Sequence, residues 1–162
     1  MTRSDGSRGG LEPASTSIQE RLYPDLDCFG CGPENPGGLQ LRSFPDDGRV
    51  VARFTPWPEH GNGLGYLNGG IISTVLDCHS AAAVILEAEH RGWPALSGAR
   101  LPYVTAGLTV RYLRPSPLDH TVELRGVVTS ATEDAMTAEV ELWWDGKPRA
   151  TATVDWRRWR PR

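Results

Sequence analysis

The sequence predicts an α+β domain in which a curved antiparallel β-sheet wraps around one long central α-helix. Two observations carry this prediction: residues 68–90 have the period of a helix, and several shorter stretches on both sides of them alternate as strands do. An apolar helix and a sheet with one apolar face bury each other when they pack together. The chain of 162 residues is long enough for one such domain with a substantial core.

The helix is expected to begin after Asn68 and to run to about His90. Asn68 is a good N-cap, because its side-chain oxygen can accept a hydrogen bond from an unpaired N–H of the first turn. Residues with a core-facing pattern then recur at spacings of three and four. They are Ile71, Ile72, Val75, Leu76, His79, Ala82, Ala83 and Leu86. Gly92 and Pro94 should end the helix.

Strands are expected on both sides of the helix. Residues 39–42 alternate, and an Asp-Gly turn at 47–48 leads into the alternating run 50–55, which predicts a hairpin. Further alternating runs follow the helix at 108–112, 122–128, 136–144 and 150–156. One-sided alternation is typical of antiparallel strands that have one buried face.

Composition excludes several classes of protein. Residues 1–20 are rich in Ser, Gly, Thr and charge, so we expect a disordered arm before a folded domain at 21–162. The net charge of −3 argues against a nucleic-acid binder. The absence of a run of 18 apolar residues argues against a membrane span. Without an apolar stretch in residues 1–10, and with three cysteines, a cytoplasmic protein without a disulfide framework is expected.

Two glycines in the first turn of the predicted helix give the first indication of chemistry. Gly69 and Gly70 each disfavour the helix by about 1 kcal/mol relative to alanine. Without side chains there, a ligand can approach the backbone N–H groups at the positive end of the helix dipole. A thioester or acyl carbonyl oxygen would be stabilised there as it gains negative charge. The alternative explanation is tight packing of the helix start against the sheet.

Asp77 is the second candidate, because it lies in the middle of an apolar helix. Burial of a carboxylate is costly unless the group has partners or a chemical role. Burial would also raise the pKa of Asp77 towards the range that suits a general base. The alternative is an acidic residue at the solvent edge of the helix.

The spacing of these groups has a consequence for assembly. Asp77 follows Gly69 by eight residues, or about 12 Å along a helix axis. A base and an oxyanion donor must both lie within a few ångström of the carbonyl on which they act. If both groups are catalytic, one copy of the chain supplies Asp77 and another supplies Gly69. The catalytic interpretation therefore predicts a homodimer with two composite sites.

The pattern Asn62-x5-Asn68-Gly69-Gly70-x6-Asp77 resembles the signature of hotdog-fold acyl-CoA thioesterases of the PaaI-like type. That family usually has His-Gly-Gly, with an acidic residue nine positions after the His and often an Asn six positions before it. Both spacings match. The resemblance implies the hotdog fold, in which the sheet wraps around the helix.

The resemblance covers about residues 22–157 and implies roles by position. The Gly69 N–H would polarise the thioester carbonyl, and Asp77 of the other chain would act as general base or as nucleophile. Asn62 would orient the water or the carbonyl, and Thr105 would assist the water. The residues implied to contact substrate are Asn68, Gly70, His60, Leu64 and Tyr66. The substrate would be an acyl-CoA, cleaved to a free acid and coenzyme A without a further cofactor.

Two features depart from the pattern of the family. Asn68 stands where His is usual, and an amide cannot titrate near neutrality. Thr105 has the opposite parity to Leu108 and Tyr112, which the alternation assigns to the core. Thr105 therefore reaches the site only if a bulge near Gly107 re-aims it, or if the site lies on the other face.

Two other functions stay open. A non-catalytic hotdog module that binds acyl-CoA is favoured by Asn68 in place of His. A hotdog enoyl-CoA hydratase would need a histidine that faces the acidic residue. His60 is better placed for that role than His79.

No metal site is expected, because Cys28-x2-Cys31 is half a zinc site and no second pair follows at suitable spacing. Zinc shared across a dimer is the less favoured alternative, and Cys78 is expected to be a small packing residue. Arg111, Arg114 and the arginines of the C-terminal tail are candidates for the phosphates of coenzyme A. The sequence leaves open whether dimers pair further into a dimer of dimers.

Overall fold

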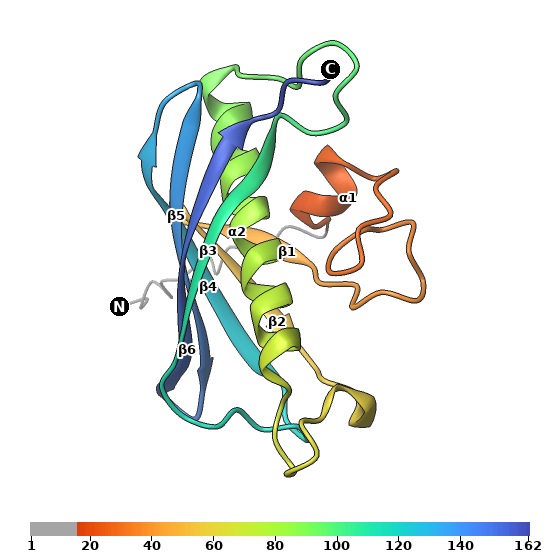
Figure 1. The fold of residues 1–162 in the computed structure, drawn as a ribbon, viewed down its shortest axis with the longest axis vertical. Helices are drawn as coiled ribbons and strands as arrows, with labels where there is room; N and C mark the ends of the chain where they lie inside the picture. Colours follow the sequence, from red (N-terminus) through yellow and green to blue (C-terminus); the bar gives the residue numbers. More distant parts are fainter. Residues whose placement is uncertain (1–15) are drawn as a thin grey trace, which may run out of the picture.

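A computed structural model describes residues 16–162, which form a six-stranded antiparallel sheet with a long helix against one face (Figure 1). The strand order is β1-β2-β4-β5-β6-β3. The strands are β1 (Ser43–Asp46), β2 (Arg49–Phe54), β3 (Tyr103–Tyr112), β4 (Val122–Ala131), β5 (Ala135–Trp144) and β6 (Lys147–Arg158). The helices are α1 (Ile18–Leu22), α2 (Gly69–Arg91) and the 3-10 helix η1 (Pro58–His60). The predicted fold, a sheet that curves around one central helix, is confirmed.

The central helix α2 has the limits that the sequence predicts. Asn68 Oδ1 caps its first turn by accepting hydrogen bonds from the N–H groups of Gly70 (2.7 Å) and Ile71 (3.3 Å). Gly92 ends the helix with a left-handed conformation, at a φ of 69°. By length and composition α2 would also suit a membrane span, but most of its apolar stretch is buried inside the fold. It therefore has the position of a core helix.

Tight Asp-Gly turns form two of the hairpins. The turn residues 47–48 and 145–146 all have positive φ angles, as two-residue hairpin turns of type I′ require. The predicted turn between the first two strands is confirmed. The first strand itself begins at Ser43 and not within residues 39–42. Gln40 has a φ of 55°, which interrupts an extended strand at that point.

The folded part of the chain begins before the predicted limit of the arm at residue 20. The short helix α1 starts after a capping box, in which Ser17 Oγ accepts from the Glu20 N–H and the Glu20 carboxylate accepts from the Ser17 N–H. Ile18 is fully buried in the core. Residues 16–20 thus belong to the folded domain, and the rest of the predicted arm lies outside the described residues.

A polar network crosses the core at His79, which is fully buried on α2. His79 Nδ1 lies 2.9 Å from Ser43 Oγ, and His79 Nε2 lies 3.1 Å from the carbonyl oxygen of Val50. The side chain of Gln19 donates to Ser43 Oγ and accepts from the Ser43 N–H. These bonds fasten α1, β1 and β2 to α2. Burial lowers the pKa of His79 to about 4, against an opposing effect of the Val50 carbonyl.

We expect acid to destabilise the protein through His79. The folded state favours the neutral imidazole, so this stabilisation is complete above pH 6.5 and is lost as the pH falls towards 4. Over that range the free energy of unfolding should fall by up to about 3 kcal/mol, measured by urea denaturation. His79→Gln should flatten this pH dependence, whereas His120→Gln, at an exposed histidine, should not. An unchanged slope in His79→Gln would contradict the assignment.

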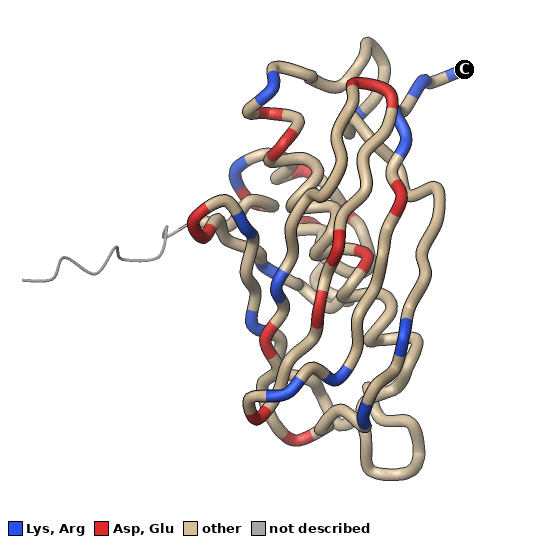
Figure 2. The backbone as a smooth tube through the Cα atoms, turned by 90° about the vertical axis from the view of Figure 1, so that its left-hand side faces the viewer, with Lys and Arg blue, Asp and Glu red and all other residues tan. Residues whose placement is uncertain are grey.

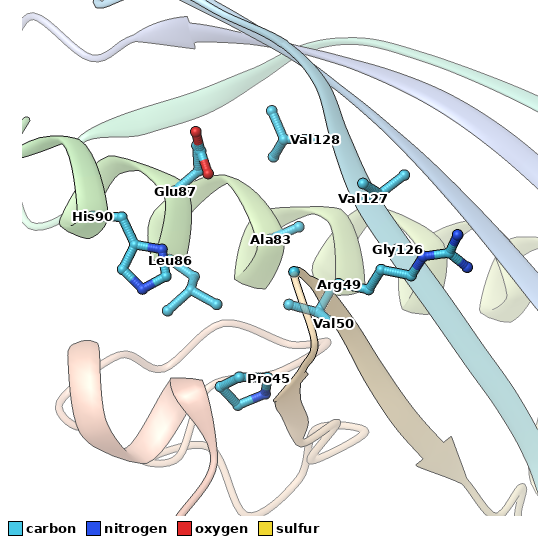
Figure 3. Close-up of a pocket in the computed structure, with 11 residues that line it drawn as sticks. Pro45, Arg49, Val50, Ala83, Leu86, Glu87, His90, Gly126, Val127 and Val128 are labelled. Atoms are coloured by element: carbon cyan, nitrogen blue, oxygen red, sulfur yellow. The ribbon is translucent and has the colours of Figure 1, made fainter.

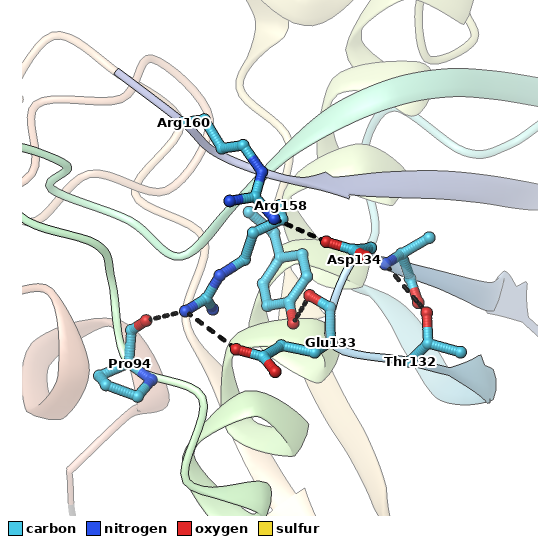
Figure 4. Close-up of polar contacts among 8 residues, drawn as sticks. Pro94, Thr132, Glu133, Asp134, Arg158 and Arg160 are labelled. Carbon is cyan, nitrogen blue, oxygen red and sulfur yellow. Dashed lines mark hydrogen bonds and ion pairs between the residues drawn. The ribbon is translucent and has the colours of Figure 1, made fainter. Parts of the chain in front are cut away.

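Arg158 on β6 ties the chain that follows α2 to the end of the sheet. Its guanidinium donates to the carbonyl oxygen of Pro94 (Figure 4). It also donates to the carbonyl oxygen of Trp93 (3.1 Å) and lies over the ring of Tyr103. Glu133 lies 4.0 Å away. A buried guanidinium needs such partners. Arg158, one of the tail arginines considered as phosphate ligands, is therefore engaged within the fold.

Charged residues of both signs are interspersed along the strands of the sheet (Figure 2). On neighbouring strands, Arg125 is paired in register with Glu141 and stacks on the ring of Trp143. Trp143 in turn donates a hydrogen bond to Glu141. Positive and negative charges on β4 and β5 therefore compensate each other locally.

Strand β3 lies at one edge of the sheet, and its outer side has no partner strand among the described residues. Leu108 is 38% exposed and Tyr112 is 55% exposed, so their predicted assignment to the core is wrong within this chain. The reason is that α2 packs mainly over β4 and β5 and covers the edge strand less completely. A ten-residue edge strand with exposed apolar side chains is a template for pairing with another chain.

Candidate active site

The start of α2 offers one free backbone donor. The cap formed by Asn68 Oδ1 occupies the N–H groups of Gly70 and Ile71. The Gly69 N–H, by contrast, has no acceptor within residues 16–162 and lies at the positive end of the helix. A carbonyl oxygen of a ligand can accept from it. Gly70, which was predicted to contact substrate, has its own N–H engaged in the cap.

Tyr112 at the end of β3 closes over the same turn. Its hydroxyl donates to the carbonyl oxygen of Gly69 (2.8 Å) and lies 2.8 Å from Ser73 Oγ. A Cβ atom at position 69 would lie 3.3 Å from the Tyr112 hydroxyl oxygen, so glycine permits this close approach. Sequence reasoning missed both hydroxyls. One signal could have identified Tyr112: alternation assigns it to the core, where its hydroxyl would need a hydrogen-bond partner.

Asp77 and Thr105 meet further along the seam between α2 and β3. Thr105 Oγ1 donates to Asp77 Oδ1 at 2.9 Å. The register of β3 against β6 shifts between Thr105 and Gly107, and this bulge gives Thr105 the same parity as Trp156, which faces α2. The bulge that the role of Thr105 requires is therefore present.

The surroundings of Asp77 suit a group that takes up protons. The side chain is half-buried, and burial raises the pKa of its carboxyl group. The hydrogen bond from Thr105 opposes this effect, because it stabilises the charged carboxylate. A raised pKa moves Asp77 towards the basicity of a useful general base.

Asn62 orders the loop that precedes α2. Asn62 Oδ1 accepts hydrogen bonds from the N–H groups of Leu64 (2.8 Å) and Tyr66 (3.2 Å). The side chains of Leu64 and Tyr66 are exposed. Together with Gly69 and Tyr112 they line an open groove of about 660 Å³. Five of the residues predicted for the site, Asn62, Leu64, Tyr66, Gly69 and Gly70, therefore lie along this groove, and the roles assigned to them stay predictions.

His60 lies outside the lining of this groove. Its ring is buried and stacks with the rings of Phe54 and Trp57, and its Nδ1 accepts a hydrogen bond from the Trp57 N–H. The backbone carbonyl of His60 accepts from the Asn68 N–H (2.8 Å), so the residue orders the loop. His79 is engaged in the core network described above. Within one chain, neither histidine is placed as a hydratase would require.

A second, smaller cleft of about 130 Å³ lies between the β1–β2 turn, the later part of α2 and β4 (Figure 3). Its polar lining comes from Arg49, Glu87 and His90. None of the residues that the sequence predicts for the site lines this cleft. The groove at the start of α2 is the candidate site, because its lining includes residues that the sequence predicts for the site.

Within one chain the free N–H and the carboxylate cannot act on one carbonyl. The helix is continuous from Gly69 to Arg91, so Asp77 lies about 12 Å along the axis from Gly69. Both groups nevertheless lie along the α2–β3 seam, because Tyr112 contacts Gly69 and Thr105 contacts Asp77. The seam borders the free edge of the sheet.

We expect Asn68→Ala to destabilise the protein by about 1 kcal/mol, because the first turn of α2 loses its side-chain cap. The measurement is the free energy of unfolding in urea. Asn68→Asp keeps an acceptor oxygen at the N-cap and should retain the stability of the wild type. Equal stability of the alanine variant and the wild type would show that the cap contributes nothing.

The fold is that of a hotdog domain, with a free backbone N–H at the tip of its central helix and the Asp77–Thr105 pair along one side of it. The family model of the thioesterase superfamily matches residues 64–150, more than half of the chain, and the chain belongs to this superfamily. This confirms the family resemblance given by the sequence pattern. A comparison with curated proteins finds no match.

Solved structures agree with this assignment. A thioesterase superfamily protein from Shewanella loihica PV-4 is 25% identical, with a TM-score of 0.58, covering 74% of this chain and 91% of its own. A putative thioesterase related to phenylacetic acid degradation, from Ralstonia eutropha JMP134, is 21% identical with a TM-score of 0.67, covering 88% and 99%. The protein smu.793 from Streptococcus mutans UA159, solved bound to acetyl CoA, is 18% identical with a TM-score of 0.60, covering 75% and 90%.

Proposed function

We propose that the protein is an acyl-CoA thioesterase with two composite active sites in a homodimer. One observation carries this proposal: the reactive groups are divided along one seam, with the free Gly69 N–H at the helix tip and the Asp77–Thr105 pair about 12 Å away. The thioesterase superfamily supplies the reaction class. The structural neighbour from Streptococcus mutans, bound to acetyl CoA, supports a coenzyme A ester as ligand.

The edge strand β3 supplies a way to bring the two halves together. Two copies of β3 can pair in antiparallel orientation about a two-fold axis beside Leu108. Exposed edge strands pair in this way, and a two-fold axis is the usual symmetry of a dimer. In that register the Tyr112 end of one copy runs towards the Thr105 end of the other. Since Tyr112 contacts Gly69 and Thr105 contacts Asp77, each helix tip then approaches the carboxylate of the other copy. The pairing also covers exposed apolar side chains of β3.

The chemistry follows from these positions. The Gly69 N–H donates to the thioester carbonyl oxygen and stabilises the negative charge that develops on it. Asp77 of the other copy takes a proton from water as the water oxygen bonds to the carbonyl carbon. The carbon–sulfur bond then breaks, and the proton passes to the departing thiolate, which leaves a free acid and coenzyme A. Direct attack by the carboxylate, followed by hydrolysis of the anhydride, stays the alternative for Asp77.

Substrate would lie in the groove at the start of α2. Leu64 and Tyr66 offer apolar surface to the acyl group, and Asn62, whose Oδ1 holds the loop, has its amide nitrogen available as a donor. Arg114 also lines the groove and is exposed, so it is the arginine best placed for a phosphate of coenzyme A.

The test is a thiol-release assay with short-chain, long-chain and aromatic acyl-CoA esters. We expect release of coenzyme A from at least one of these classes, by a protein that elutes as a dimer in size-exclusion chromatography. Binding of the esters in calorimetry without thiol release from any class would favour the non-catalytic binding module instead. A fully active monomer would contradict the proposal that the active sites are composite.

A further inference from the structure

Three cysteines meet where the chain between α1 and β1 packs on α2. The sulfur atoms of Cys28, Cys31 and Cys78 all lie within 4.8 Å of one another. Cys31 and Cys78 are buried, and Cys28 is half-buried. The sequence shows only the half-site Cys28-x2-Cys31. The third sulfur comes from the middle of α2, 47 positions further along the chain, where spacing gives no indication of it.

We propose that Cys28, Cys31 and Cys78 bind a thiophilic metal ion of the zinc class, with a solvent molecule as the fourth ligand. Tetrahedral coordination with zinc–sulfur bonds of about 2.3 Å places two sulfur ligands about 3.8 Å apart. Cys28 Sγ and Cys78 Sγ are 3.8 Å apart. A disulfide would need about 2.05 Å. The half-buried side of the cluster, at Cys28, leaves an approach for the ion and for water.

The loop that carries Cys28 and Cys31 packs closely against α2. A Cβ atom at Gly30 would lie 2.2 Å from Cys78 Sγ, so glycine at this position lets the loop reach α2.

Tyr23 provides an independent observation. Its side chain is 5% exposed, and its hydroxyl has no hydrogen-bond partner among the described residues. Its side chain lies near Cys31 of the cluster without forming a hydrogen bond to it. A buried donor without an acceptor is costly. A metal-bound thiolate at Cys31 would provide the acceptor, because a negatively charged sulfur accepts more strongly than a neutral thiol.

The ion would fasten a segment that has little regular structure. Residues 23–42 contain no helix or strand, yet they pack against the middle of α2. A metal that joins Cys28 and Cys31 to Cys78 links this segment to the helix one residue after Asp77. The site lies beyond the proposed thioesterase activity, and its test does not depend on that activity.

The experiment is a titration of the reduced full-length protein with cobalt(II). We expect one cobalt per chain, with the visible bands of tetrahedral cobalt and near-ultraviolet thiolate charge transfer, both removed by added zinc. Cys28→Ser should lower the cobalt affinity by more than about tenfold. The matched control Thr74→Ser, beside the cluster, keeps all three thiols and should bind as the wild type does.

A second measurement guards against misfolded variants. Zinc should raise the Tm of the wild type and of Thr74→Ser but not that of Cys28→Ser. Reduced wild type that shows no cobalt bands would overturn the site, as would Cys28→Ser that binds cobalt with unchanged affinity. A third outcome would also overturn the site. If the reduced protein took up no cobalt and readily formed a disulfide between Cys28 and Cys31, the cluster would be assigned to redox chemistry instead.

Discussion

Replacing Asp77 with asparagine should lower kcat for acyl-CoA hydrolysis by about 10²- to 10⁴-fold, because the amide cannot take up the proton of the attacking water. The amide oxygen can still accept the hydrogen bond from Thr105 that Asp77 Oδ1 accepts in the wild type. The fold should therefore survive, as judged by the Tm and the oligomeric state. KM should change little if the carboxylate acts in the transition state and not in binding.

Glu87 is the matched control for Asp77. It lies on the same helix, it is half-buried, and its carboxylate is paired with Arg91 away from the α2–β3 seam. Glu87→Gln should retain the kcat of the wild type. This result would show that the loss of turnover in Asp77→Asn does not come from a general loss of negative charge on α2. If Asp77→Asn turned over substrate within about twofold of the wild type, Asp77 would be neither base nor nucleophile.

The central helix and the hairpins were predictable because local chemistry determines them. Asn68 and Gly92 mark the two ends of α2 by capping rules that act within one turn. The Asp-Gly turns determine their hairpins in the same local way. The start of the folded chain was missed, although the capping box of Ser17 and Glu20 is itself a local signal.

The candidate site was predictable in part, since spacing along one helix relates Gly69 to Asp77. The contacts of the site that the sequence did not predict involve β3, the edge strand of the sheet. The alternation of β3 assigns Tyr112 to the core. In the structure α2 covers β3 only in part, so Tyr112 stays exposed and its hydroxyl contacts Gly69 at the helix tip. The third cysteine of the cluster, Cys78, is likewise brought to the other two by packing over a long sequence separation, which no local pattern encodes.

A mixed dimer should restore activity that neither parent has. Gly69→Pro removes the free N–H while suiting the first position of a helix, and the extended backbone of Asn68 is compatible with a following proline. Loss of this donor should lower kcat by about 10²- to 10³-fold, whereas Gly69→Ala, which keeps the N–H, should lose less. Asp77→Asn damages the other half of the site. A dimer with one copy of each variant therefore holds one intact site and one doubly damaged site.

Co-expression with two different tags, followed by purification over both, isolates this mixed dimer. Its kcat per dimer should be about half that of the wild type, because one of its two sites is intact. The control pairs Asp77→Asn with Asp77→Ala, which damage the same half, and should stay inactive. If the tandem purification recovered no mixed dimer, or recovered one no more active than its parents, Gly69 and Asp77 would not meet across two copies. The separation of about 12 Å along one rigid helix would then exclude their joint action on a single carbonyl.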